Sequence, residues 1–159
     1  MSAQHSISRL KDDMGKTAHK AMLLVEDNPD DMEFALLALR ENGLAGKVVV
    51  ARDGQEALDY LFSGAAEDRP GFVLLDLKMP RVDGFEVLRQ MRANAATSHL
   101  PVVVLSSSNE ECDLEDCYKL GANSYVQKSL DFSKFTESIR QIGHYWLDLN
   151  EVPGACRPA

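Results

Sequence analysis

The chain has 159 residues, a net charge of −8 and a hydrophobic fraction of 45%, which together are typical of one globular domain. The first 20 residues carry four Lys or Arg and two Asp, so the remaining residues carry a charge of −10. Such an acidic body argues against a nucleic-acid surface, which would need clustered basic residues.

Apolar runs and cysteines indicate the compartment. No apolar run approaches the length of a membrane span, and the N-terminus lacks the apolar region of a signal peptide. The three cysteines are odd in number and contain no C-x-x-C pattern, which fits a reducing compartment and favours neither disulfides nor a zinc site. We therefore expect a cytoplasmic protein without a membrane or nucleic-acid partner.

The chain divides into three parts. Residues 1–19 are polar and mixed in charge, and we expect a leader there. Residues 20–148 should form one domain, and 149–159 a C-terminal tail. Within the domain, short apolar runs predict strands buried on both faces. These runs are residues 21–25, 47–51, 72–75 and 101–105, and a short fifth strand is expected at 123–126.

Helix start signals follow the strands. Asn28 and Pro29 predict an N-cap and a first-turn proline, for a helix that stops at Gly43. Other N-caps are expected from their position or from a Glu three residues later, at Asp53, Asp83, Ser108 and Asp131.

Strands that alternate with helices five times predict an α/β fold, a doubly wound five-stranded parallel sheet with helices on both faces. Right-handed crossovers leave few topologies, and we predict the strand order 2-1-3-4-5. The first and third strands are then neighbours. Glu26 and Asp27 end the first strand and Asp76 ends the third, so these acids should converge where ligands bind in open α/β sheets.

Asp76 is the central residue of the prediction. It follows the apolar run 72–75 and precedes a turn with Met79 and Pro80. Taken alone, it could be a strand-terminating residue that caps a turn. The acidic pair after the first strand and Lys128 after the last strand favour a chemical role instead.

This pattern resembles the receiver domain of two-component response regulators, over roughly residues 21–148. Asp76 and Ser106 are 30 residues apart, and Ser106 and Lys128 are 22 apart, as in typical receivers. The segments VEDNPDD, DGQEALDYL, LGANSYVQKSLDF and HYWL are similar to the phytochrome-associated, single-domain regulators. The resemblance implies a flavodoxin-like (CheY-like) fold. Further matching residues are Glu26, Asp27, Met79, Pro80, Asp83, Gly84, Gly121, Ala122 and Tyr125.

The resemblance implies that Asp76 accepts a phosphoryl group from a sensor histidine kinase, here a bacterial phytochrome kinase. Lys128 would neutralise charge and Ser106 would donate a hydrogen bond to the phosphoryl group. In receivers this hydroxyl and the aromatic at Tyr125 move together as a switch, although simple strand packing is the alternative for Tyr125. No output domain follows the last helix, so we expect signalling by protein contact rather than an enzyme.

A divalent cation would relieve the repulsion among the crowded carboxylates, and oxygen ligands suit Mg²⁺. We assign Asp27 and Asp76 as direct ligands, and Glu26 as a ligand through water. The backbone carbonyl of Lys78 is the fourth group, and its side chain takes no part.

Ser129 is a departure from the family, because receivers normally have proline after the lysine. A cis bond before a residue other than proline costs about 2.5–4 kcal/mol. We therefore predict a trans path between Lys128 and Ser129. The position of Lys128 depends on this loop.

Other functions fit less well. An aspartyl-phosphate hydrolase would carry a second acid two positions after the nucleophile, where this chain has Lys78. A flavin or dinucleotide binder would need a glycine-rich first turn, and VEDNPDD has no glycine. An unphosphorylated interaction scaffold and a phosphate sink for the kinase stay open.

Phe34 and Leu37 are candidates for contact with the kinase. They lie beside the apolar stripe of the first helix. They either widen the core face or form a docking surface.

The C-terminal segment is the candidate dimer interface. A final helix of about fifteen residues covers a sheet, and this length ends near Tyr145. Trp146, Leu147, Leu149 and Val152 lie beyond it. We predict a two-fold homodimer through residues 131–149, with folding back onto the same domain as the alternative.

Overall fold

The computed structural model describes residues 21–153, so the predicted leader and residues 154–159 lie outside the described part. Five parallel strands form one sheet in the order β2-β1-β3-β4-β5, which confirms the predicted topology. The observed strands begin or end within one residue of the predicted runs. They are β1 (Met22–Val25), β2 (Val48–Ala51), β3 (Phe72–Leu75), β4 (Val102–Ser106) and β5 (Ser124–Gln127).

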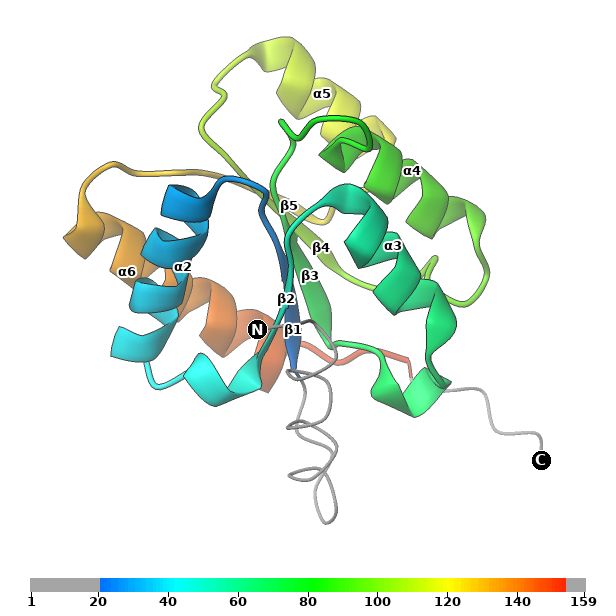
Figure 1. Ribbon diagram of the computed structural model, residues 1–159, viewed down its shortest axis with the longest axis horizontal. Helices are drawn as coiled ribbons and strands as arrows, with labels where there is room; N and C mark the ends of the chain where they lie inside the picture. The colour runs from blue at the N-terminus through cyan, green and yellow to red at the C-terminus, as the bar shows by residue number, and fades with distance from the viewer. Residues whose placement is uncertain (1–20, 154–159) are drawn as a thin grey trace.

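Helices cover both faces of the sheet, as predicted (Figure 1). One face packs against α2 (Pro29–Glu41) and α6 (Phe132–Gly143). The other packs against α3 (Gly54–Ser63), α4 (Gly84–Ala93) and α5 (Glu111–Lys119). Two 3₁₀ turns, η1 (Ala45–Lys47) and η2 (Ala66–Asp68), and a π-helical turn, η3 (His144–Leu149), complete the described elements. No helix among residues 21–153 has the length and apolar character needed to cross a membrane.

The helix caps agree with the sequence at four of five starts. The side chains of Asn28, Asp53, Asp83 and Asp131 each accept a hydrogen bond from a backbone N–H in the first turn. The prediction for Ser108 is wrong. The N-cap of α5 is Glu110, whose side chain makes no cap bond. Ser108 lies before the helix, where its hydroxyl accepts the Glu110 N–H and donates to Asp113.

Sheet register places the acidic residues together. Val25 of β1 pairs with Leu75 of β3, so the residues that follow them, Glu26 and Asp76, leave the sheet side by side. The backbone N–H of Asp76 donates to the Val25 carbonyl at 3.1 Å and extends the ladder by one bond. The sheet thus positions both carboxylates through paired backbone.

The C-terminal segment folds back on its own domain. The Trp146 ring lies 6.4 Å from the Phe72 ring between centroids, and Leu147 is buried. These two residues therefore do not need a partner to cover them, and that part of the argument for an intermolecular arm is wrong. Tyr145 and Leu149 remain 48% and 59% exposed.

Candidate functional site

Asp76 lies at the carboxyl end of β3, where the backbone of α4 approaches it closely. The N–H of Gly84 donates to the Leu77 carbonyl at 2.9 Å. A Cβ atom at Gly84 would overlap the carbonyl oxygen of Asp76. Because glycine has no Cβ, the start of α4 can approach the backbone of Asp76, and the loop after Asp76 can turn tightly.

Glu26, Asp27 and Asp76 form the predicted acidic cluster. Each offers a carboxylate oxygen, and these oxygens lie within 4.8 Å of one another. Burial raises the pKa of Glu26, and the charge of Asp76 adds to this effect. Burial likewise raises the pKa of Asp76, with a smaller contribution from Asp27. The three acids thus hold negative charge that is costly at close range.

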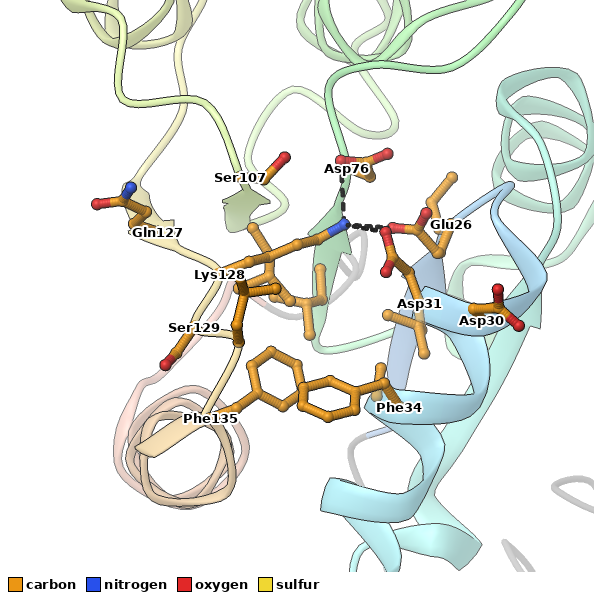
Figure 2. A pocket seen from close by; sticks show the side chains of 16 residues that line it. Glu26, Asp30, Asp31, Phe34, Asp76, Ser107, Gln127, Lys128, Ser129 and Phe135 are labelled. Atoms are coloured by element: carbon orange, nitrogen blue, oxygen red, sulfur yellow. Dashed lines mark hydrogen bonds and ion pairs between the residues drawn. The ribbon is translucent and has the colours of Figure 1, made fainter. Parts of the chain in front are cut away.

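Lys128 lies among these acids, as predicted. Its ammonium is 2.8 Å from Oε2 of Glu26 and 3.4 Å from Oδ1 of Asp76. Figure 2 shows the side chain reaching from the loop after β5 toward both carboxylates. Burial acts to lower the pKa of Lys128, but the surrounding carboxylates outweigh it and the pKa is raised. Lys128 is therefore a partly buried, charged counter-ion of the cluster.

The loop that carries Lys128 follows the predicted trans path, since no peptide bond in residues 21–153 is cis. The backbone N–H of Lys128 donates to the Ser106 carbonyl at 2.8 Å, which continues the ladder between β4 and β5. This bond fixes where the side chain leaves the backbone. Serine at position 129 therefore does not displace the lysine.

Ser106 and Tyr125 are joined through Ser108. The Ser106 side chain is buried, and its Oγ accepts the Ser108 N–H at 3.1 Å. The Tyr125 hydroxyl donates to the Ser108 carbonyl at 2.7 Å, while its ring packs against the core. Both switch candidates therefore contact the same residue of the loop between β4 and α5.

The acidic cluster fits a hard divalent cation. It offers three carboxylates whose oxygens lie within 4.8 Å of one another, and a cation would relieve the repulsion among such crowded charges. The Lys78 ammonium is engaged elsewhere, 3.1 Å from Oδ2 of Asp113. This agrees with an exclusively backbone role for Lys78 at a metal, which stays a prediction.

Asp31 is a site residue that the sequence prediction missed. Its Oδ2 lies 3.3 Å from the Lys128 ammonium, as a third carboxylate around that charge. The sequence does contain an indication of this position. Asn28 caps α2 directly after β1, so the first turn of α2 lies close to the carboxyl end of that strand. A first-turn acid at this place therefore faces the cluster.

A cavity of about 560 Å³ opens beside Lys128, between α2 and α6. The rings of Phe34 and Phe135 form its floor, with centroids 4.8 Å apart (Figure 2). Leu130 at its edge is fully exposed. Phe34 is thus packed into the apolar layer between the helices, whereas Leu37 is 38% exposed on the surface.

Residues 22–140 match the response regulator receiver domain family. FilR2 of Methanothrix harundinacea, described as a probable methanogenesis regulatory protein, is 40% identical over 135 residues, covering 84% of this chain and 87% of FilR2. The response regulator Rcp1 of Synechocystis is 34% identical over 139 residues, covering 86% of this chain and 95% of Rcp1.

Solved structures of response regulators are also similar to this chain. The phosphorylated cyanobacterial phytochrome response regulator RcpA has a TM-score of 0.76 and 37% identity, over 86% of this chain and 99% of RcpA. The Mn²⁺-bound form of Rcp1 has a TM-score of 0.74 and 32% identity, over 85% of this chain and 99% of that chain. A phosphorylated form and a metal-bound form thus both occur among its structural neighbours.

Proposed function

Since this chain belongs to the response regulator receiver family, we propose that it accepts a phosphoryl group on Asp76 from a histidine kinase and signals by protein contact. The observation that carries the proposal is the convergence of Asp76, Glu26 and Lys128 from the ends of β3, β1 and β5. These three residues are far apart in the chain, and the fold brings their charged atoms within hydrogen-bonding distance.

In the proposed transfer, an Asp76 oxygen attacks phosphorus while the bond from phosphorus to the donor histidine nitrogen breaks, and the nitrogen keeps the electron pair. Such a transfer depends on positioning and charge neutralisation more than on covalent assistance. Lys128 is close enough to Asp76 to move from that carboxylate onto a phosphoryl oxygen. A bound Mg²⁺, held by Asp27, Asp76 and the Lys78 carbonyl, would supply further positive charge.

We favour a signalling receiver over an enzyme that acts on other substrates. Lys78 stands two positions after Asp76, and its ammonium is paired with Asp113, so no second acid is available there as a general acid or base. An unphosphorylated scaffold has no need of a buried lysine among three acids. The reducing compartment inferred from the cysteines supports a cytoplasmic site of action, with Cys112 and Cys117 both free.

The proposed phosphodonor is a phytochrome-type kinase, supported by the similarity to RcpA. The test is transfer of radiolabel from two autophosphorylated kinases, one of phytochrome type and one without a photosensory domain. Faster transfer from the phytochrome kinase, with a rate that changes between red and far-red light, is the expected result. Equal transfer from both kinases would remove the phytochrome assignment and leave the receiver assignment standing.

We also propose a two-fold homodimer through α6 and η3. This proposal is supported by apolar side chains that stay exposed although Trp146 and Leu147 pack against the domain. They are Tyr145, Leu149 and Phe132, the last of which is 38% exposed. These side chains lie along the helical segment that ends the domain. A dimer through them would adjoin the helix layer formed by α2 and α6.

A further inference from the structure

A hydrogen-bonded chain joins Lys78 to the two switch candidates, and the proposed transfer makes no use of it. Lys78 Nζ lies 3.1 Å from Asp113 Oδ2, and the Ser108 hydroxyl donates to the same oxygen at 2.7 Å. Ser108 in turn donates its N–H to Ser106 Oγ and accepts from the Tyr125 hydroxyl through its carbonyl. We call the contacts among Lys78, Asp113 and Ser108 the Asp113 latch.

The latch has the features of a strong contact. The Asp113 side chain is only 10% exposed, and its bond from Ser108, followed by its pairing with Lys78, holds its pKa below the usual range. Hydrogen bonds to a charged carboxylate are roughly twice as strong as neutral ones. The Ser108 hydroxyl also accepts the N–H of Glu110 at 3.2 Å, so this bond and the latch together tie Ser108 to the start of α5.

The latch opposes the movement that phosphorylation requires. If the Ser106 hydroxyl moves toward a phosphoryl group on Asp76, its bond from the Ser108 N–H is kept only when Ser108 moves with it. The Ser108 carbonyl would then shift as well, and the hydroxyl of Tyr125 would lose its acceptor. Both movements are resisted while the Ser108 side chain is fastened to Asp113.

We infer that Asp113 is a positioning residue that, through Ser108, holds Ser106 and Tyr125 in the unphosphorylated arrangement. The inference rests on the proposed phosphorylation of Asp76. Breaking the latch costs free energy, which the interactions of the phosphoryl group must supply. The strength of the latch therefore sets the ratio of the unphosphorylated to the phosphorylated arrangement of Ser106 and Tyr125.

Two variants release the latch in different ways. Ser108→Ala removes the hydroxyl without changing the charge and keeps both backbone bonds of Ser108, although it also deletes the bond from the Glu110 N–H. Asp113→Ala removes the carboxylate. Glu110→Gln is the control, because it removes one negative charge from the same loop and leaves the latch intact. The probe is beryllium fluoride with Mg²⁺, which mimics a phosphoryl group on a carboxylate.

The readouts are the beryllium fluoride affinity and the ¹⁹F NMR resonance of 3-fluorotyrosine at position 125, assigned with Tyr125→Phe. In both latch variants we expect the unliganded Tyr125 resonance to move toward the position of the liganded wild type. The Kd for beryllium fluoride should fall about tenfold or more, as expected for the loss of one opposing hydrogen bond to a charged group. Glu110→Gln should change neither quantity.

A lower Tm in both latch variants with an unmoved Tyr125 resonance and an unchanged Kd would overturn the inference, because the contact would then be structural only. If the wild type itself fails to bind beryllium fluoride, the proposed phosphorylation is wrong. In that case the inference falls with the proposed function, whereas a wild type that binds beryllium fluoride together with latch variants that behave like it would overturn the inference alone.

Discussion

The ammonium of Lys128 lies 2.8 Å from the carboxylate of Glu26, a residue 102 positions earlier in the chain. The Lys128 side chain is 15% exposed and that of Glu26 is 4% exposed. Desolvation of both groups is costly, and their attraction offsets it only while both are present. This pair therefore links the charge of the site to the stability of the fold.

Replacing Lys128 with Met should lower the free energy of unfolding in metal-free buffer. Glu26 and Asp76 would then lack their counter-charge. We expect a loss of about 2 kcal/mol, below the roughly 3–5 kcal/mol of a fully buried pair because solvent reaches the ammonium. Urea denaturation measures the change. Arg140→Met, which breaks an exposed pair with Glu137, is the control and should have little effect. Equal losses in the two variants would contradict a special role for Lys128.

Mg²⁺ should stabilise the protein through the acidic cluster. At about one hundred times its Kd, a ligand that binds only the folded state adds about 2.7 kcal/mol to the free energy of unfolding. Asp27→Ala should remove most of this increment, because it deletes a ligand of the cation. Glu110→Gln should retain the increment, because Glu110 belongs to a different group of potential metal ligands, formed with Cys112 and Asp113. The increments are measured by urea denaturation with and without Mg²⁺. A full increment in Asp27→Ala would exclude this site as the metal site.

Kinase docking should depend on exposed apolar residues on α2 and on the loop after β5. Leu37 and Leu130 are exposed, whereas Phe34 packs into the core and is unsuitable for a test. Leu37→Ser combined with Leu130→Ser should slow transfer from the kinase about tenfold, an interface loss on the order of 1.4 kcal/mol. Labelling by acetyl phosphate should be unchanged.

Phe62→Ser is the matched control for docking, because Phe62 has the same 38% exposure as Leu37 but lies on α3, across the sheet. It should leave transfer from the kinase unchanged. If the double variant loses labelling by acetyl phosphate as well, the substitutions have damaged the site. If Phe62→Ser slows the kinase equally, docking is not confined to the α2–α6 face.

Self-association should depend on the exposed residues of η3. Leu149→Asp combined with Tyr145→Ser should weaken a dimer at least tenfold without a loss of folding, since neither side chain is buried. Analytical ultracentrifugation measures the dissociation constant. Tyr118→Ser on α5 is the control, at 49% exposure. An unaltered dimer in the η3 variant would place the interface elsewhere.

Most of the site could be predicted from the sequence because strand ends are local signals. Glu26 and Asp76 each follow a recognisable apolar run, Lys128 follows the predicted fifth strand, and the crossover rule then brings these strands together. Asp31 was missed because its role depends on the direction in which α2 leaves β1, which the N-cap at Asn28 determines.

Two other differences from the prediction have tertiary causes. Ser108 was predicted as an N-cap from local spacing, but its hydroxyl donates to the carboxylate of Asp113, which Lys78 holds from another loop. Trp146 and Leu147 were placed outside the domain by helix length alone. The ring of Phe72, at the start of β3, is a packing partner for Trp146. An estimate based only on helix length does not take such a tertiary contact into account.

The identity of the phosphoacceptor is tested most directly by labelling Asp76→Asn and the wild type with radioactive acetyl phosphate in the presence of Mg²⁺. Asparagine is close to aspartate in shape and removes charge from a crowded acidic cluster, so the variant should fold at least as stably. The account predicts one phosphoryl group per wild-type chain that alkali and hydroxylamine release, as expected for an acyl phosphate, and none in the variant. Full-strength labelling of folded Asp76→Asn would contradict it.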